Sequence, residues 1–170
     1  MKKSFFVVPV LIFAGLLTAA ETNLVEVPAA GMGKWMFWTA VNHQGRAGWQ
    51  NGVAFIRGVK VSGTIHTSIK CTPGHEYDFT VEARPRSERI TGTASLTAVC
   101  RATDGKWIHK GKKIVRLRSK QRGEWEKLSI RFKAPENSKT LYFQMGVSGL
   151  KDGEEVEFRN PRLVDLTAAE

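Results

Sequence analysis

Hydrophobic and polar side chains alternate along most of the chain. In the segment 76–83 the odd positions are Tyr77, Phe79, Val81 and Ala83, whereas the even positions are polar or acidic. Successive side chains of a β-strand point to opposite faces, so this period of two predicts an antiparallel strand with one buried face. The same alternation marks 96–101, 127–132 and 141–147, and no stretch of ten or more residues shows the period of an amphipathic helix.

Turn residues separate these runs at short intervals. They are Gln50-Asn51-Gly52, Thr72-Pro73-Gly74, Thr103-Asp104-Gly105, Ala134-Pro135-Glu136-Asn137 and Lys151-Asp152-Gly153. Gly, Pro and Asn supply the backbone angles that tight turns need, and many short strands joined by such turns indicate a β-sandwich or barrel. The expected strands are 22–27, 34–41, 53–60, 64–71, 76–84, 93–101, 112–118, 124–133, 140–147 and 155–166. We therefore predict an all-β, antiparallel β-sandwich that forms one binding domain over residues 21–170.

Residues 1–20 have the three parts of a secretory signal peptide. Lys2 and Lys3 give a basic start, an apolar run follows, and Thr18, Ala19 and Ala20 are small. The apolar run is shorter than the ~20 residues that a membrane-spanning helix needs. The leader predicts a secreted, periplasmic or cell-surface protein without a membrane span.

Several segments resemble, in order and spacing, the bacterial carbohydrate-binding modules of the family 4 and family 9 type. These segments are 23–25, 51–56, 69–79 with its Pro73-Gly74 turn, 124–132 with Trp125 near its start, and 158–163. The resemblance covers nearly all of 21–170. It implies a jelly-roll sandwich of the galactose-binding-domain type, and a module that binds polysaccharide without acting on it.

The same resemblance bears on metal binding and on the cysteines. Members of the family often close with acidic residues that help to hold calcium, but here that place reads Arg159-Asn160-Pro161-Arg162. We expect no metal and no other cofactor, with Glu26 and Asp165 as the remaining calcium candidates. Cys71 and Cys100 both have core parity, and in an oxidising compartment they form either a disulfide or two buried thiols.

Aromatic and polar residues supply the candidate ligand site. Sugar rings present an apolar face on which an indole can stack, while neighbouring polar side chains bond the hydroxyls. Trp35 and Trp38 have opposite parity in one strand, so one of them is expected to be exposed. Trp49 lies among glycines, in an expected loop, where it either plugs the core edge or waits for a ligand. The candidate binding residues on the concave sheet are Trp38, Trp49, Arg57, His66 and Gln144.

A run of positive charge suggests an acidic ligand. Eight Lys or Arg lie between positions 106 and 122 with no acidic residue among them, and the formal net charge is +10, or about +8 without Lys2 and Lys3. Arg116, Arg118 and Lys120 share strand parity, so they would form a basic stripe beside Trp107. Such a stripe either binds an anionic polymer or guards an edge strand against sheet-to-sheet pairing.

No motif for catalysis is present. The chain has no Gly-x-Ser-x-Gly, no His-Glu-x-x-His and no Gly-rich phosphate loop. The sequence therefore predicts a non-catalytic glycan-binding module, with an anionic polysaccharide rather than nucleic acid as its partner. The alternatives are a structural or adhesive cell-surface module that binds protein and, less favoured, a small glycoside-active enzyme.

Overall fold

The computed structural model describes residues 22–41 and 44–168, and the expected signal peptide 1–20 lies outside this part. The strands are β1 (Ala30–Gly31), β2 (Met36–Thr39), β3 (Arg46–Gln50), β4 (Val53–Arg57), β5 (Ser62–Lys70), β6 (Glu76–Pro85), β7 (Thr93–Ala102), β8 (Trp107–Arg116), β9 (Glu126–Lys133), β10 (Ser138–Ser148) and β11 (Glu155–Asp165). Over the described residues no helix has the length and apolarity that crossing a membrane requires.

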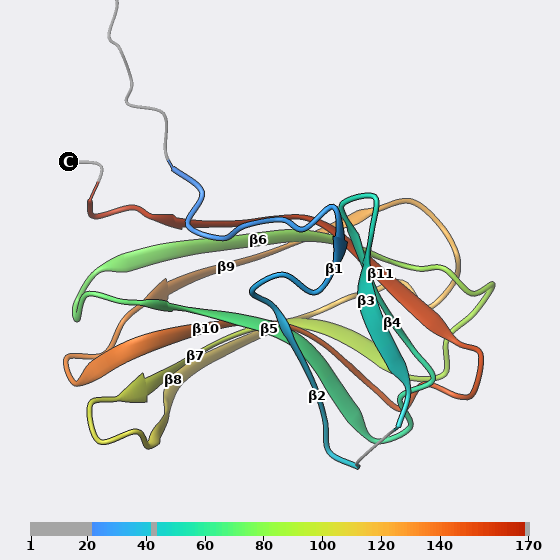
Figure 1. The fold of residues 1–170 in the computed structure, drawn as a ribbon, viewed down its shortest axis with the longest axis horizontal. Coiled ribbons are helices and arrows are strands. Elements are labelled where there is room, and N and C mark those ends of the chain that lie inside the picture. The colour runs from blue at the N-terminus through green and yellow to red at the C-terminus, as the bar shows by residue number, and fades with distance from the viewer. Residues whose placement is uncertain (1–21, 42–43, 169–170) are drawn as a thin grey trace, which may run out of the picture.

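The strands form two antiparallel sheets that pack face to face (Figure 1). The six-stranded sheet has the order β1-β3-β4-β11-β6-β9, and the five-stranded sheet has the order β2-β5-β10-β7-β8. In Figure 1 the six-stranded sheet supplies the upper layer, with β6, β9 and β11, and the five-stranded sheet the lower layer. The predicted all-β antiparallel sandwich is therefore confirmed.

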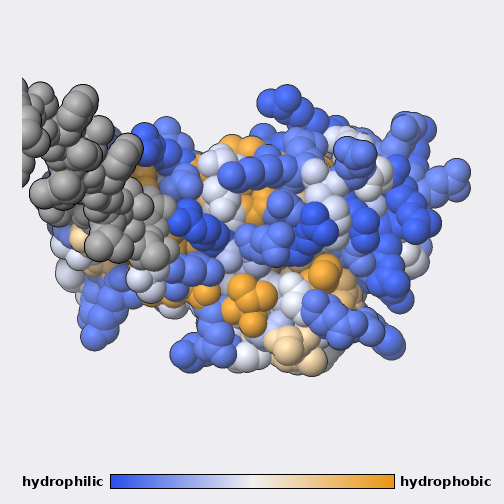
Figure 2. Space-filling view, turned by 90° about the horizontal axis from the view of Figure 1, so that it is seen from above, coloured by the Kyte–Doolittle hydropathy of each residue, from blue (hydrophilic) through white to orange (hydrophobic). Residues whose placement is uncertain are grey.

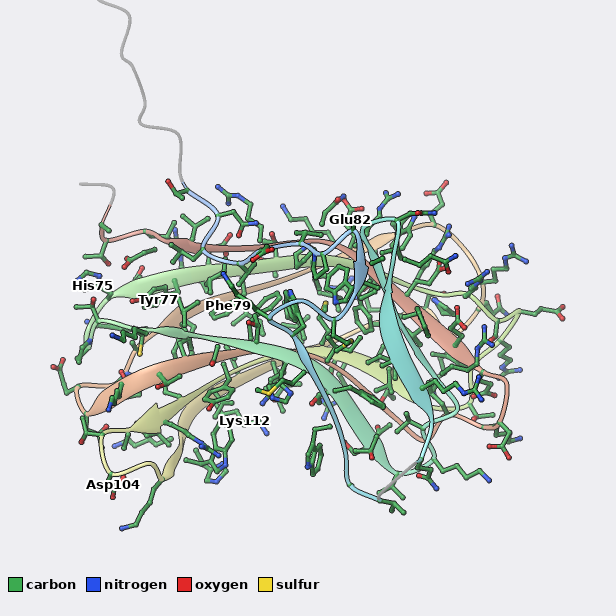
Figure 3. All side chains as sticks on the ribbon, in the orientation of Figure 1. His75, Tyr77, Phe79, Glu82, Asp104 and Lys112 are labelled. Carbon is green, nitrogen blue, oxygen red and sulfur yellow. The ribbon has the colours of Figure 1, made fainter. Side chains whose placement is uncertain are left out.

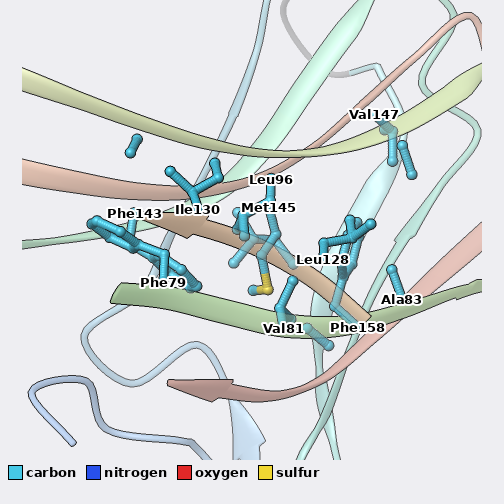
Figure 4. Packing of buried hydrophobic residues seen from close by; sticks show 14 of the residues in the cluster. Phe79, Val81, Ala83, Leu96, Leu128, Ile130, Phe143, Met145, Val147 and Phe158 are labelled. Carbon is cyan, nitrogen blue, oxygen red and sulfur yellow. The ribbon is translucent and has the colours of Figure 1, made fainter. Parts of the chain in front are cut away.

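The core lies between the sheets and is built from the apolar face of each strand. Phe79 of β6 stacks on Phe143 of β10 with 5.0 Å between ring centroids and only 9° between the ring planes. Ile130, Leu96 and Met145 lie next to this pair, and Leu128 and Phe158 lie further along the core (Figure 4). The apolar core residues recur at every second position in β6 and β10, so the alternate side chains of these strands point outward.

Four strand assignments need correction, and one of them is the two-residue strand β1, which was not predicted. The segment 22–27 is not a strand, although Leu24 donates a backbone hydrogen bond to the carbonyl of Leu163 (2.8 Å). β3 was not predicted; it forms a hairpin with β4 through Asn51 and Gly52, whose φ angles of 51° and 73° are those of a tight hairpin turn. β8 begins at Trp107, earlier than the expected 112. It has two segments paired with β7, and the four residues between these segments bulge out, which interrupts the alternation that would have marked the first segment.

The outer face of the six-stranded sheet is covered by ion pairs. Arg84 pairs with Glu157 (2.8 Å), Arg86 with Glu155 (2.9 Å) and Arg159 with Glu82 (2.5 Å). Figure 3 shows Glu82 on this upper side and Phe79 between the layers. Figure 2 looks down on the same face, which is mostly hydrophilic with scattered apolar residues. Arg57, Arg84, Arg86 and Arg159 are therefore each matched by a glutamate on this face.

Candidate functional site

The outer face of the five-stranded sheet holds a hollow of about 510 Å³, called the groove below. It crosses the sheet from the edge strand β2 to the edge strand β8. The lining residues are Met36, Trp38, Thr64, His66, Arg101, Trp107, Tyr142 and Gln144.

Strand register brings these residues together. Met36 lies opposite His66, and His66 lies opposite Gln144, so one row crosses β2, β5 and β10. The next row begins with Trp38, opposite Thr64, which in turn lies opposite Gly146. Since residues two apart on a strand share a face, the side chains of both rows point away from the core and into the groove.

Gly146 keeps the floor of the groove low between Thr64 and Ser95. A Cβ at this position would lie 3.2 Å from Cγ2 of Thr64 and 3.4 Å from Oγ of Ser95, which is tighter than ordinary contact. A larger residue would therefore push against the floor and fill part of the hollow.

Large apolar side chains are exposed along both edges of this face. Met36 is 54% exposed and Trp38 is 53% exposed on β2, while Trp107 is 39% exposed and Ile114 is 42% exposed on β8. Exposing an indole to water is unfavourable unless the ring has another use, and grouped exposed aromatics mark interaction sites. The two tryptophans frame the groove from opposite edges of the sheet.

Arg101 contacts two aromatic rings at the β8 end. Its guanidinium carbon lies 4.4 Å from the ring centroid of Trp107 and 5.5 Å from that of Tyr142. The Trp107 and Tyr142 rings themselves lie 4.7 Å apart between centroids. These contacts attract the cation to the ring faces and fix its position.

Two polar atoms of the groove are buried without a hydrogen bond, Nε of Arg101 and Nδ1 of His66. Burial lowers the pKa of His66, and the nearby carbonyl of Thr64 offsets this only in part. The imidazole is therefore neutral at pH 7 and offers one donor and one acceptor. With the amide of Gln144 and the hydroxyls of Thr64 and Tyr142, the groove can donate and accept hydrogen bonds along its floor.

Three of the five predicted binding residues meet in this groove. Trp38, His66 and Gln144 line it together, and Trp107, predicted for the basic stripe, closes its far side. The sequence interpretation missed Met36, Thr64, Arg101 and Tyr142. Three of the four could have been found by parity, since Met36 shares a face with Trp38, Thr64 with His66, and Tyr142 with Gln144.

Trp49 is a core residue and not a ligand residue. It lies on β3 opposite Ala54, is 3% exposed, and packs its ring 5.3 Å from that of Trp35. The expected loop is a strand, which turns the indole inward beside the buried Ala54 and Ile56.

Arg57 belongs to the wrong sheet for the predicted role. It ends β4 in the six-stranded sheet, and its guanidinium forms an ion pair with Glu155 on the outer face. The alternation in 53–57 was interpreted correctly, but Arg57 points away from the groove, on the opposite side of the sandwich.

The basic stripe does not form as predicted. Arg116 is the last residue of β8, and Arg118 and Lys120 lie beyond it in a loop. Arg118 pairs with Glu126 (3.9 Å), and Nζ of Lys120 donates to the carbonyl of Thr91 (3.4 Å). Trp107 begins the same strand that Arg116 ends, so the indole and the cation stand at opposite ends of β8.

The two calcium candidates each contact a basic side chain. Glu26 pairs with Lys34 (3.2 Å), and Asp165 pairs with Nδ1 of His75 (2.8 Å). Among residues 22–41 and 44–168 no group of three or more His, Cys, Asp or Glu is arranged to hold a metal ion.

Cys71 and Cys100 are neighbouring free thiols at the edge of the core, beside the five-stranded sheet. Cys71 is half-buried and hydrogen-bonded to Oγ of Ser138 (3.4 Å), while Cys100 is buried. A hydrogen bond from the Cys100 thiol lowers the pKa of Cys71, and the same contact raises that of Cys100. Cys71 is therefore the thiol of the pair that ionises first.

Oxidation is expected to join Cys71 and Cys100, because the Cys71 thiolate lies within hydrogen-bonding reach of the other sulfur. The bridge would close a loop of about thirty residues and stabilise the fold by about 3 kcal/mol in the chain-entropy model. Free-thiol titration of unfolded, unreduced protein after treatment with oxidised glutathione checks this. Two reactive thiols per chain would show that the pair resists bridging.

Comparisons with known proteins identify the fold. No protein-family model matches the chain, and no curated protein matches it. A solved structure of the enzymatically active domain of tailspike protein 4 from bacteriophage CBA120 is similar, with a TM-score of 0.66 and 10% identity over 85% of this chain. The chain spans only 21% of that protein.

Two smaller solved structures are similar over most of their own length. A family 16 carbohydrate-binding module has a TM-score of 0.57 and 11% identity, covering 85% of this chain and 100% of the module. A family 61 carbohydrate-binding module in complex with β-1,4-galactotriose also has a TM-score of 0.57, with 12% identity over 85% of this chain and 99% of the module. At such identities the likeness establishes the β-sandwich fold that carbohydrate-binding modules use.

Proposed function

We propose that this chain is a secreted, non-catalytic carbohydrate-binding module that holds a glycan in the groove. The observation that carries the proposal is the pair of exposed indoles, Trp38 and Trp107, on opposite edges of a hollowed sheet face. Between them lie an imidazole, an amide, a phenol and a guanidinium. The fold shared with carbohydrate-binding modules of families 4, 16 and 61 supports it.

The chemistry of the groove suits a sugar chain. An indole stacks on the apolar C–H face of a pyranose ring, while polar groups beside it exchange hydrogen bonds with the equatorial hydroxyls. Two indoles separated by the width of the sheet favour an oligosaccharide that spans the groove over a single sugar. The finer assignment to the family 4 and family 9 type rests on the motifs of the sequence.

Binding without turnover is part of the proposal. None of the eight residues that line the groove is an aspartate or glutamate. Hydrolysis of a glycosidic bond ordinarily requires two carboxyl groups facing the bond from two sides. His66, neutral and without a carboxylate partner, does not supply an alternative acid and base pair by itself.

A glycan array combined with affinity electrophoresis tests the proposal. We expect retention of the protein by at least one polysaccharide, with no release of reducing ends from that polysaccharide. Absence of retention on every glycan, together with capture by a cell-surface protein, would favour the adhesive module. Release of reducing ends would favour the glycoside-active enzyme.

We also propose that the preferred glycan is anionic, on account of the formal net charge of +10 and the absence of acidic residues from the groove. The screening length falls from about 10 Å at 0.1 M salt to about 3 Å at 1 M. Retention on a uronic-acid or sulfated polysaccharide is therefore expected to drop steeply over this range, as affinity electrophoresis at increasing salt measures. Tight, salt-independent retention on neutral glycans alone would contradict this preference.

A further inference from the structure

Arg101 has no counter-ion among the described residues, in contrast to four arginines in or beside the opposite sheet. Arg57, Arg84, Arg86 and Arg159 each pair with a glutamate. Arg101 forms no salt bridge with any described residue, its Nε is buried without a hydrogen bond, and no carboxylate lines the groove beside it. A partly desolvated charge without a partner costs free energy, and an anion that binds there recovers it.

The aromatic contacts of Arg101 prepare it to receive an anion. Its position over the Trp107 ring and near Tyr142 restrains the guanidinium, so less rotational freedom is lost when its N–H groups are used. Arginine presents its N–H groups as a planar fork that matches the geometry of carboxylate, sulfate and phosphate.

A second cation stands on the same row of the sheet. Lys70 of β5 and Arg101 of β7 both lie opposite Thr140 of the intervening strand β10. Two strand spacings separate their backbones, about 10 Å. Lys70 is exposed and makes no salt bridge with a described residue, so this end of the sheet carries two unpaired positive charges next to the groove.

From this arrangement we propose that Arg101 is the subsite for an acidic substituent of the bound glycan, a uronate carboxylate or a sulfate ester. The sugar ring that carries the substituent stacks on the exposed face of Trp107, and the anion accepts hydrogen bonds from Arg101, with Lys70 adding charge. Neighbouring sugars continue toward His66, Gln144 and Trp38. The inference rests on the proposed glycan-binding function and names the acidic class that the groove selects.

Matched polymers that differ in the acidic group test this subsite. The carboxylate pair is polygalacturonate and its methyl ester, and the sulfate pair is dextran sulfate and dextran. At 0.1 M salt we expect the protein to be retained about tenfold more strongly by the acidic member of one pair, because a charge-assisted hydrogen bond in a partly buried site has about that effect. The pair that responds identifies the carboxylate or the sulfate as the ligand group.

Three variants separate Arg101 from overall charge. Arg101→Gln is expected to reduce the preference for the acidic polymer to within about twofold, while Arg101→Lys retains part of it because the charge stays but the planar fork is lost. Arg131→Gln removes the same charge from the exposed face of β9 in the opposite sheet, and is expected to keep the wild-type preference. Thermal unfolding of each variant verifies that the fold is intact.

The outcomes distinguish this inference from the function on which it rests. Equal losses in Arg101→Gln and Arg131→Gln would mean that net charge alone attracts the polymer, and the subsite would be wrong. Retention of neutral glycans without any preference for the acidic members would likewise overturn the subsite but leave the glycan-binding function standing. Absence of retention on every glycan would overturn both.

Discussion

Replacement of Trp38 or Trp107 by alanine is expected to weaken glycan binding by about 30-fold each, the effect of removing a hot-spot aromatic worth about 2 kcal/mol. Both rings are substantially exposed in the free protein, so their removal costs little core packing. Loss of affinity should therefore come without loss of thermal stability.

Isothermal titration with the best oligosaccharide from the array measures the effect, and differential scanning calorimetry verifies the fold. Trp125→Ala is the matched control, since this indole lies on the outer face of the opposite sheet between Arg84 (4.3 Å) and Arg159 (4.2 Å). We expect its removal to leave affinity unchanged. If Trp125→Ala abolished binding while Trp38→Ala and Trp107→Ala did not, the ligand would be held by the six-stranded sheet.

The sandwich was predictable because burial of one face places apolar residues at every second position of the longest strands. The segment 76–84 was expected as a strand and is β6, 76–85, and the residues of its expected apolar face, Tyr77, Phe79, Val81 and Ala83, are all buried. The expected apolar faces of β7 and β10, which are neighbours inside the five-stranded sheet, are buried as well, although Thr80, Thr97 and Val99 are also covered on the opposite face. Burial of one face against the other layer constrains these positions directly, so the pattern is strong there.

The groove could be predicted only in part, because parity assigns a side chain to a face but does not say which sheet the strand joins. Trp38, His66 and Gln144 were placed correctly on outward faces of strands that do belong to one sheet. Arg57 was placed on an outward face by the same reasoning, yet β4 pairs with β11 in the other sheet. Sheet membership is set by pairing between distant segments, which no local pattern records.

The edge strand β8 was the least predictable element. Its segment is dominated by charge, with exposed lysines at 110, 112 and 113, so almost no apolar alternation marks it. Two pairs flank a bulge in this strand: Ile108 lies opposite Cys100, and Lys113 lies opposite Ala98. The four residues between Ile108 and Lys113 face only Val99 of β7. Such a bulge shifts parity, and edge strands often carry bulges and lysines that discourage pairing with other chains.

The sequence contains a signal that Trp49 lies in a strand rather than in the predicted loop. Asn51-Gly52 between two short segments is a strong signal for a two-residue hairpin, which requires a strand before the turn as well as after it. In such a hairpin Trp49 faces Ala54, and Ala54 shares its face with Ile56. Continuation of the apolar face of 53–57 across the turn would have placed the indole in the core.

Trp49→Ala is therefore expected to lower the free energy of unfolding by about 3–5 kcal/mol, the usual cost of removing a large buried aromatic. The ring is almost fully buried and packs against Trp35, which in turn lies edge-on to Phe143 (5.7 Å), so the cavity would open in the centre of the core. For a domain of about 150 residues this corresponds to a fall in Tm of about 10 °C or more. Calorimetry of the variant measures both quantities.

Substitution of each buried tryptophan by phenylalanine tests the role of the indole N–H group in stability. Nε1 of Trp35 donates a hydrogen bond to the carbonyl of Glu26 (2.7 Å), whereas Nε1 of Trp49 is buried without a partner. Trp35→Phe loses a hydrogen bond and leaves a carbonyl unpaired, but Trp49→Phe removes only an unsatisfied donor. We expect Trp35→Phe to be the more destabilising by about 1 kcal/mol. Trp49→Ala with unchanged stability and weakened glycan binding would instead return Trp49 to the ligand site.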